Sequence, residues 1–318
     1  MTASIRRSLS VDLGGLPIAT PVMIAAGCAG TGRELGGLVE TRRVGAVVTR
    51  TITVEPRQGS APPRIVETPS GIVWSTGLQN PGVDVFLLTE LPEWTKGPPV
   101  IVSIGGGSLE EYVRLTGALQ GRAGIAGIEV HLSGPDEEMQ RPVLGAHVDR
   151  VTEIVGAVAR MSLVPVLAKI PGGVDVVPLA IAAARAGATC LTLTDSPPAL
   201  AIDLAATRPA LGGPTGWLAG PAVKPLTLRA VADVARALPR MPLVASGGVR
   251  TSTDAVEALL AGASAVQIGT ATLLDPVAPV TIAHGIAAEL QRRGLPSPSH
   301  LRGAVAPIPV IASEGTHA

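Results

Sequence analysis

Short apolar runs without polar alternation recur along the chain, and stretches with helical spacing follow most of them. Parallel strands that are buried on both faces have this appearance. The runs predict six strands, at residues 21–27, 45–52, 99–104, 127–132, 165–170 and 188–194. Two further runs, within 241–250 and 263–270, end abruptly in glycine and bring the number to eight. An alternating order of eight strands and helices predicts a single (β/α)8 TIM barrel of the α/β class, with its chemistry at the carboxyl ends of the strands.

Four segments fall outside this repeat. Residues 9–18, with two glycines at 14 and 15, predict a small N-terminal hairpin that plugs the bottom of the barrel. Residues 64–74 predict an inserted hairpin that turns at 69–71, and the Gly/Pro-rich excursion 195–225 predicts a lid or substrate loop. We expect the C-terminal tail, 296–318, to be mobile or to dock on a partner. Because no linker is evident, residues 1–318 are expected to form a single domain.

The last two runs contain the strongest local signal for a ligand. Gly247 and Gly248 end one predicted strand, and Gly269 and Thr270 end the next. Glycine lets backbone N–H groups approach an anion closely, and a helix N-terminus adds a favourable dipole. Adjacent turns of this kind on the last two strands of a barrel predict a phosphate site.

The composition of the chain restricts the kinds of partner that we expect. Twenty-five basic residues balance twenty-five acidic ones, so nothing implies nucleic acid or an anionic membrane surface, and a small-molecule substrate is favoured. Two cysteines, Cys28 and Cys190, cannot build a disulfide framework or hold an iron–sulfur cluster, which favours a reducing cytoplasm. No metal-ligand cluster is evident, and no uninterrupted apolar stretch is long enough to span a bilayer.

Reactive side chains stand where predicted strands end. Lys169 is the only lysine within a strongly apolar strand, and the cost of burying an unpaired ammonium favours a cofactor role. For His131 two interpretations stay open: an imidazole that faces the ligand, or one that only hydrogen-bonds the following loop. Asp136 and Asp195 lie in turn-like surroundings, where capping carboxylates are common. Trp74 either covers the cavity mouth or reshapes the cavity itself.

The chain resembles the class 1 dihydroorotate dehydrogenases, most closely the bacterial form that works with a separate electron-transfer subunit. The residues that carry this resemblance lie at 45–57, 62–69, 77–82 and 216–225 and in the two glycine turns. It implies a homodimer and FMN, with the phosphate on Gly247, Gly248, Gly269 and Thr270. Lys169 would stand beside the N1–C2=O region of the flavin, where a cation stabilises the reduced ring. The remaining cofactor contacts that it implies are Ala26, Gly27, Thr51, Ser103, Ser196 and Gly220.

The chain departs from the family at the substrate site. The family carries asparagine at four positions that here hold Trp74, His131, Asp136 and Asp195. Gly134 stands in place of the family's catalytic cysteine, which takes a proton while hydride leaves for flavin N5. Arg50 replaces a lysine and changes the donor geometry.

We therefore expect an FMN-dependent oxidoreductase, a paralogue with an altered substrate site, that transfers hydride between flavin N5 and a small molecule other than dihydroorotate. The expected reaction interconverts a C–C or C–N single and double bond. His131, Asp136 and Arg50 are the expected catalytic residues, and Trp74, Asp195 and Ser133 are expected to bind substrate. Two alternatives stay open: a genuine dihydroorotate dehydrogenase with an unusual base, and a non-catalytic flavin-binding partner.

Overall fold

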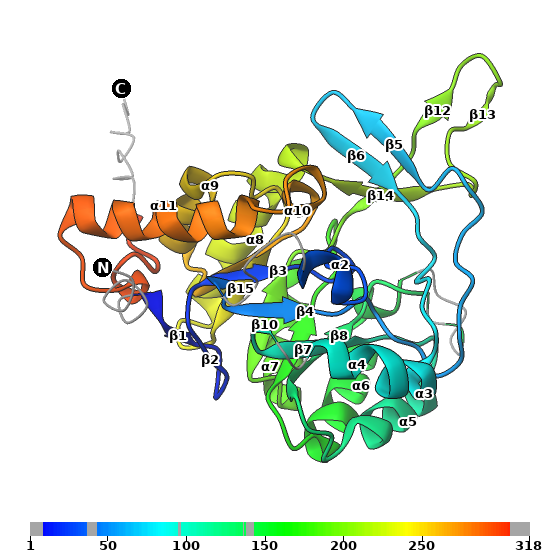
Figure 1. The fold of residues 1–318 in the computed structure, drawn as a ribbon, viewed down its shortest axis with the longest axis horizontal. Helices are drawn as coiled ribbons and strands as arrows, with labels where there is room; N and C mark the ends of the chain where they lie inside the picture. The colour runs from blue at the N-terminus through cyan, green and yellow to red at the C-terminus, as the bar shows by residue number, and fades with distance from the viewer. Residues whose placement is uncertain (1–8, 37–42, 95–96, 136, 138–142, 306–318) are drawn as a thin grey trace, which may run out of the picture.

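Eight parallel strands close into a barrel in the computed structural model, which describes residues 9–36, 43–94, 97–135, 137 and 143–305 (Figure 1). Each barrel strand pairs with the next barrel strand along the chain, and β16 pairs back to β3, which confirms the predicted (β/α)8 barrel. Seven of the eight predicted runs contain one of these strands, and the run 127–132 overlaps β8, which begins two residues earlier, at Ile125. In chain order the barrel strands are β3 Val22–Ile24, β4 Ala46–Val48, β7 Val100–Ile104, β8 Ile125–His131, β9 Val166–Lys169, β10 Cys190–Leu193, β15 Leu243–Ser246 and β16 Ala265–Ile268.

Helices surround the barrel and bury their apolar faces against it (Figure 1). The longer ones are α5 Leu109–Leu119, α6 Val148–Met161, α7 Val176–Ala186, α8 Lys224–Ala237, α9 Ser252–Ala261 and α11 Ala278–Arg293. The shorter ones are α2 Arg33–Gly36, α3 Val83–Val85, the π-helix η2 Phe86–Glu90, α4 Leu91–Trp94 and α10 Thr270–Leu274, with 3-10 turns η3 Leu144–Ala146, η4 Pro221–Val223 and η5 Pro298–His300. Local chemistry fixes where α9 begins, because Thr251 and Asp254 form a reciprocal capping box there.

The N-terminal hairpin closes the amino end of the barrel. Its strands, β1 Val11–Asp12 and β2 Pro17–Ile18, are antiparallel. Leu13, Leu16 and Ile18 are buried in a cluster with interior side chains of the barrel strands, among them Met23, Val48, Leu167 and Val244. The predicted plug is thus present, and it leaves the opposite end of the barrel for the site.

The inserted hairpin is present as β5 Ile65–Thr68 and β6 Gly71–Trp74, and it does not stand alone. Strand β14 Gly216–Ala219, from the long excursion, pairs antiparallel with β6, and β11 Pro198–Ala199 pairs with β14. The excursion 195–225 is therefore part of a four-stranded sheet beyond the carboxyl end of the barrel, and a second hairpin, β12 Ile202–Asp203 and β13 Arg208–Pro209, projects beyond that sheet (Figure 1).

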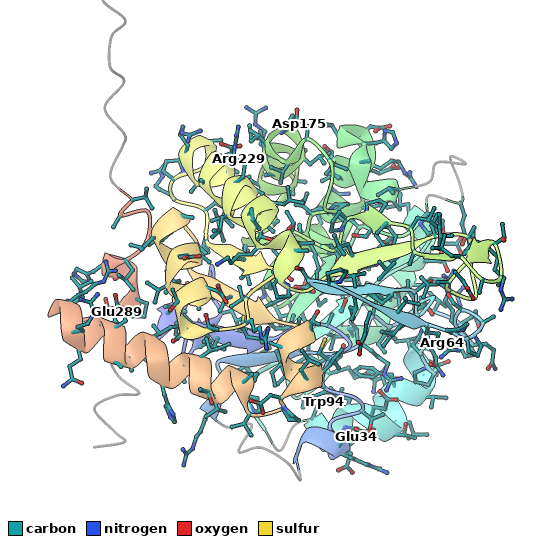
Figure 2. The ribbon with its side chains drawn as sticks, turned by 90° about the horizontal axis from the view of Figure 1, so that it is seen from above. Glu34, Arg64, Trp94, Asp175, Arg229 and Glu289 are labelled. Carbon is teal, nitrogen blue, oxygen red and sulfur yellow. The ribbon has the colours of Figure 1, made fainter. Side chains whose placement is uncertain are left out.

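Arg64 stabilises the inserted hairpin at the point where the chain enters and leaves it (Figure 2). Its guanidinium donates to the carbonyl oxygens of Ser60 and Gln58, at 2.6 and 3.0 Å, and to the side-chain oxygen of Gln79 at 2.5 Å. One side chain thereby ties together the chain segments that enter and leave the inserted hairpin.

The first part of the C-terminal tail packs on the chain's own barrel, in contrast to the expectation of a mobile or partner-bound segment. Leu301 is buried, and the guanidinium of Arg302 donates to the carbonyl oxygens of Gly262, Pro239 and Met241. These contacts anchor the tail beside β15. Residues 306–318 lie outside the described part of the chain.

We expect Leu13→Ala to lower the free energy of unfolding by about 2–5 kcal/mol, because it removes a fully buried side chain from the plug. The site at the other end should keep its geometry. Leu204→Ala is the matched control: Leu204 is 88% exposed, so this change should stay within about 0.5 kcal/mol. Denaturant titrations of the two variants give the comparison, and equal midpoints would contradict the role assigned to the plug.

Candidate active site

The carboxyl ends of the barrel strands bring most of the expected site residues to one face. Ala26 and Gly27 follow β3, Thr51 follows β4, and Asp195 and Ser196 follow β10. Ser103, His131 and Lys169 are the members that lie within strands, in β7, β8 and β9. Gly220 precedes η4, and the glycine turns follow β15 and β16. Asp136 lies outside the described residues.

Lys169 is the buried cation of this face. Its Nζ lies 3.5 Å from Glu129 Oε1, 3.9 Å from Asp195 Oδ1 and 3.4 Å from Gln267 Oε1. Burial disfavours the ammonium, but the carboxylates of Glu129 and Asp195 outweigh this effect and raise the pKa of Lys169. The side chain is therefore charged, and its three N–H donors have only one hydrogen-bond partner within the described residues.

Glu129 is the partner that sequence reasoning did not find. It is fully buried in β8, where its Oε2 accepts hydrogen bonds from Thr192 at 2.9 Å and from Gln267 at 2.6 Å. Its Oε1 accepts no hydrogen bond from a described residue and faces Lys169. A signal was available: Glu129 precedes His131 by two residues in a predicted strand, so both side chains point to the same face.

Asp195 connects three strand ends. Its Oδ2 lies 3.3 Å from His131 Nδ1 and accepts a hydrogen bond of 2.7 Å from the Ser133 hydroxyl. Its Oδ1 accepts a hydrogen bond of 2.9 Å from the backbone N–H of Ser196 and faces Lys169. Burial would raise the pKa of Asp195, but Lys169, His131 and Ser133 together hold it well below its usual range. Asp195 is an ionised carboxylate whose two oxygens are both engaged.

His131 ends β8, and its position is held on both sides. The hydroxyl of Tyr112 donates to the backbone oxygen of His131 at 2.6 Å, and Asp195 lies at Nδ1. Within the described residues no hydrogen bond reaches Nε2, and the side chain keeps 13% of its surface exposed. The ring thus presents one free nitrogen at the mouth of the barrel.

Several positions at this face have room for a ligand. A Cβ added at Gly27 would meet nothing within 4 Å, and at Gly269 its nearest neighbour would be Ala25 Cβ at 3.7 Å. At Gly134 the nearest atom would be the Gly106 oxygen at 3.9 Å. Gly248 differs, because a Cβ there would overlap the backbone nitrogen of Lys224. Close packing of α8 on this turn accounts for that glycine.

Thr51 and Ser103 form a polar pair between β4 and β7. Their hydroxyl oxygens lie 2.9 Å apart, and both side chains are buried. Cys28, beside Gly27, is a neutral thiol: burial raises its pKa to about 11, although Lys169 acts in the opposite direction. A thiol in this state is a poor nucleophile and a poor base.

Trp74 connects the inserted sheet to the barrel. It ends β6, and its indole Nε1 donates to the Ser196 hydroxyl at 3.3 Å. Since Ser196 follows Asp195 directly, this hydrogen bond ties the end of the inserted hairpin to the chain that carries Asp195.

Arg50 is not brought into this cluster. Its Nε lies 3.9 Å from Glu90 Oε2 on the π-helix, and neither atom has a hydrogen bond within the described residues. Burial raises the pKa of the Glu90 carboxyl. The positive charge of Arg50 acts to lower that pKa, and the negative charge of Glu34 acts to raise it further. Glu34 and Trp94 lie on the same side of the molecule (Figure 2). Arg50 therefore belongs to a neighbouring charged group and has no described contact with His131 or Lys169.

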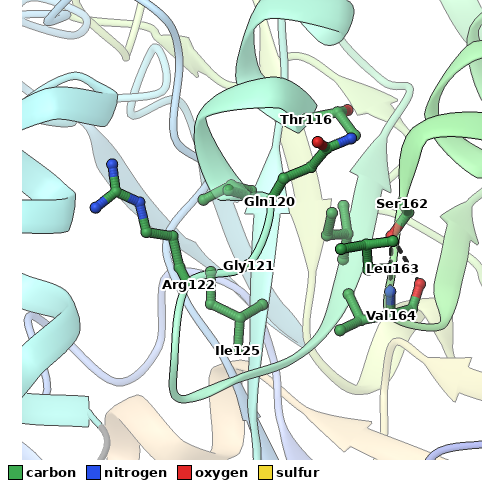
Figure 3. Close-up of a pocket in the computed structure, with 10 residues that line it drawn as sticks. Thr116, Gln120, Gly121, Arg122, Ile125, Ser162, Leu163 and Val164 are labelled. Carbon is green, nitrogen blue, oxygen red and sulfur yellow. Dashed lines mark hydrogen bonds between the residues drawn. The ribbon is translucent and has the colours of Figure 1, made fainter.

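A separate surface pocket lies at the opposite end of the barrel, between the loops that precede β8 and β9 (Figure 3). Its lining includes Gln120, Gly121, Arg122, Ile125, Leu163 and Val164. None of the polar cluster around Lys169 contributes to it. Among described residues, no group of three or more His, Cys, Asp or Glu is placed to hold a metal ion, and no helix is long and apolar enough to cross a membrane.

Comparison with known proteins agrees with this geometry. A family model described as dihydroorotate dehydrogenase matches residues 8–290. A protein of Geotalea uraniireducens (strain Rf4), named dihydroorotate dehydrogenase B (NAD(+)), catalytic subunit, is 40% identical over 299 residues, which cover 93% of this chain and 98% of that protein. A protein of the same name from Geotalea daltonii is 41% identical with the same coverage. Another, from Geobacter sulfurreducens, is 41% identical over 286 residues, 89% of this chain and 92% of that protein.

The matched region includes all eight barrel strands, the inserted hairpin and both glycine turns. The expected resemblance is therefore confirmed, and the chain belongs to the dihydroorotate dehydrogenase family of flavin oxidoreductases.

Proposed function

We propose that this protein is an FMN-dependent oxidoreductase that interconverts a C–C or C–N single and double bond in a small molecule other than dihydroorotate. The observation that carries the proposal is the contact between His131 and the ionised Asp195, 3.3 Å apart, at positions where the family resemblance implies neutral asparagines. A proton-transfer group and a negative charge take the place of amides that recognise the family's substrate.

The residues at the barrel mouth suit FMN. Gly27 borders open space, a Cβ at Gly269 would make only ordinary van der Waals contacts, and the Lys169 ammonium has a single hydrogen-bond partner among the described residues. Lys169 would meet the flavin ring, Ala26, Gly27, Thr51, Ser103 and Ser196 would line it, and Gly220, Gly247, Gly248, Gly269 and Thr270 would surround the phosphate end. When bound, FMN supplies two-electron redox chemistry by accepting or donating a hydride. The chain's own residues supply orientation, charge and a site for the accompanying proton.

His131 is the residue that we assign to this proton. Gly134 has no side chain to hold one, whereas His131 has an imidazole whose Nε2 has no hydrogen bond with any described residue. The rigid end of β8 fixes the ring, as general acid–base catalysis requires. Asp136 stays a candidate from the sequence alone, and Trp74 and Ser133 would border the substrate.

A second candidate is a genuine dihydroorotate dehydrogenase that uses His131 as an unusual base. The identity of about 40% to proteins of that name, over 93% of the chain, favours it. The ionised Asp195 counts against it, because orotate is itself an anion.

The relatives are named catalytic subunits, and the name includes NAD(+). By analogy, a separate electron-transfer protein would connect this chain to its electron acceptor or donor. A homodimer and a cytoplasmic location complete the proposal.

Purified protein should be yellow and carry about one FMN per chain, which absorbance and chromatography of the released flavin measure. Gly269→Asp should abolish retention because a carboxylate would stand at the phosphate end. Gly269→Asn is the matched control: it adds a side chain of the same size without the charge and should retain more flavin. Colourless wild-type protein that also fails to take up added FMN would refute the enzymatic proposal.

Dihydroorotate should reduce the flavin slowly or not at all, and orotate should bind weakly. The charge of Asp195 opposes the orotate carboxylate, and each 1.4 kcal/mol of repulsion, a rough allowance for such a pair, lowers affinity about tenfold. The double variant His131→Asn/Asp195→Asn restores two family residues and should bind orotate more tightly in a flavin absorbance titration. Rapid anaerobic bleaching of wild-type flavin by dihydroorotate would instead favour the second candidate.

His131→Asn should slow flavin reduction by a reactive substrate about 10²–10⁴-fold while FMN stays bound, because the variant lacks the proton-transfer group. Stopped-flow absorbance measures the rate. His300→Asn is the control, since His300 is exposed and its ring hydrogen-bonds, among the described residues, with Ser297 and Ser299. An unchanged rate in His131→Asn, with normal flavin content, would clear His131 of any chemical role.

A further inference from the structure

The contacts of Asp195 indicate which nitrogen of His131 exchanges the proton and which residue orients the imidazole. We propose that Asp195 is a positioning residue rather than a substrate ligand, and that it holds His131 in the Nδ1–H tautomer so that Nε2 is the proton acceptor at the barrel mouth. This inference rests on the proposed function for its chemical meaning, but its geometry stands independently of the flavin.

Asp195 has little hydrogen-bonding capacity left to bind a substrate. Its Oδ2 is shared by His131 Nδ1 and the Ser133 hydroxyl, and its Oδ1 is shared by the Ser196 N–H and Lys169. The two side chains are about equally exposed, at 13% for His131 and 14% for Asp195, so exposure does not separate them. What separates them is that both carboxylate oxygens already have partners, whereas His131 Nε2 has no hydrogen bond within the described residues.

The Asp195 carboxylate decides which tautomer the neutral His131 ring adopts. An ionised carboxylate only accepts hydrogen bonds, so the nitrogen that faces it must carry the proton. Asp195 faces Nδ1, and Nε2 has no hydrogen bond within the described residues. The neutral ring consequently presents an unprotonated nitrogen to the mouth, which is the form a general base needs.

Asp195 also stabilises the positive charge that His131 carries once it has accepted the proton. An imidazolium at His131 would lie 3.3 Å from the Asp195 carboxylate, which stabilises it. Ser133 and Ser196 keep that carboxylate in place, at 2.7 and 2.9 Å. The same contacts would hold the imidazolium in the reverse direction, in which it returns the proton to the substrate.

These features define a substrate class. In the oxidative direction a weakly acidic C–H or N–H bond of the substrate breaks, its proton goes to Nε2, and its electron pair forms the new π bond. The FMN of the proposed function, when bound, would supply the two-electron acceptor for the hydride of the neighbouring carbon, so both electrons and both hydrogens are accounted for. The carboxylate behind the imidazole favours a substrate that carries no negative charge at this place.

Nitrogen-15 NMR of histidine-labelled protein tests the tautomer without a substrate. The chain has five histidines, and the signal lost in His131→Asn identifies the relevant one. At a pH where its spectrum shows the neutral ring, wild-type His131 should have a protonated Nδ1 and an unprotonated Nε2. In Asp195→Asn the amide can donate to Nδ1, so the population should move toward the Nε2–H tautomer. Ser133→Ala removes one of the two groups that hold the carboxylate but leaves its negative charge beside Nδ1, so the Nδ1–H tautomer of His131 should persist.

A protonated Nε2 in the neutral ring of the wild-type protein would overturn the inference, and so would an unchanged pattern in Asp195→Asn. The wild-type spectrum decides even if that variant does not fold. Flavin content is measured on the same samples. Failure to bind FMN would refute the proposed function while leaving the tautomer readable, and a wrong tautomer in yellow protein would refute only the role of Asp195.

Discussion

The buried ammonium of Lys169 is the constraint on which the site depends. An isolated charge in the interior of a barrel is costly, so it needs opposite charge within a few ångströms. Glu129 and Asp195 provide that charge, at 3.5 and 3.9 Å, from the strands on either side of β9. Asp195 also lies 3.3 Å from His131 Nδ1, so the ammonium and the imidazole share one counterion. The cation, its counterions and the imidazole therefore act as one electrostatic unit.

The inserted sheet gives this unit a fixed cover. Strand β14 joins the excursion after β10 to the hairpin after β4, and Trp74 at the end of that hairpin donates to Ser196. A sheet ladder and a side-chain bond thus connect three regions that are far apart in the sequence. The cover is built from backbone pairing, whereas a free loop would have to order itself around each ligand. An indole that bonds Ser196 and an imidazole that faces Asp195 also distinguish this mouth from one lined by amides.

Much of the fold could be read from local patterns. The eight barrel strands lie within apolar runs without alternation, because strands buried on both faces have no polar side to reveal. Residues 64–74 form the expected hairpin, and Thr251 with Asp254 caps α9, because turns and caps depend on neighbouring residues. The lysine at 169 was recognisable for a similar reason, since a charge inside an apolar strand conflicts with its surroundings and needs an explanation.

The sequence by itself determined the barrel, the order of its strands, the plug at its amino end and the set of reactive residues at its carboxyl end. Only the tertiary structure decided which of these residues meet. Sequence reasoning named His131, Asp136 and Asp195 separately; Asp136 lies outside the described residues, and Asp195 contacts His131 from a strand end two places along the barrel. Arg50 meets Glu90 rather than the cluster, and Glu129 joins it. Side-chain contacts between strands depend on barrel closure and register, and no local pattern encodes these distances.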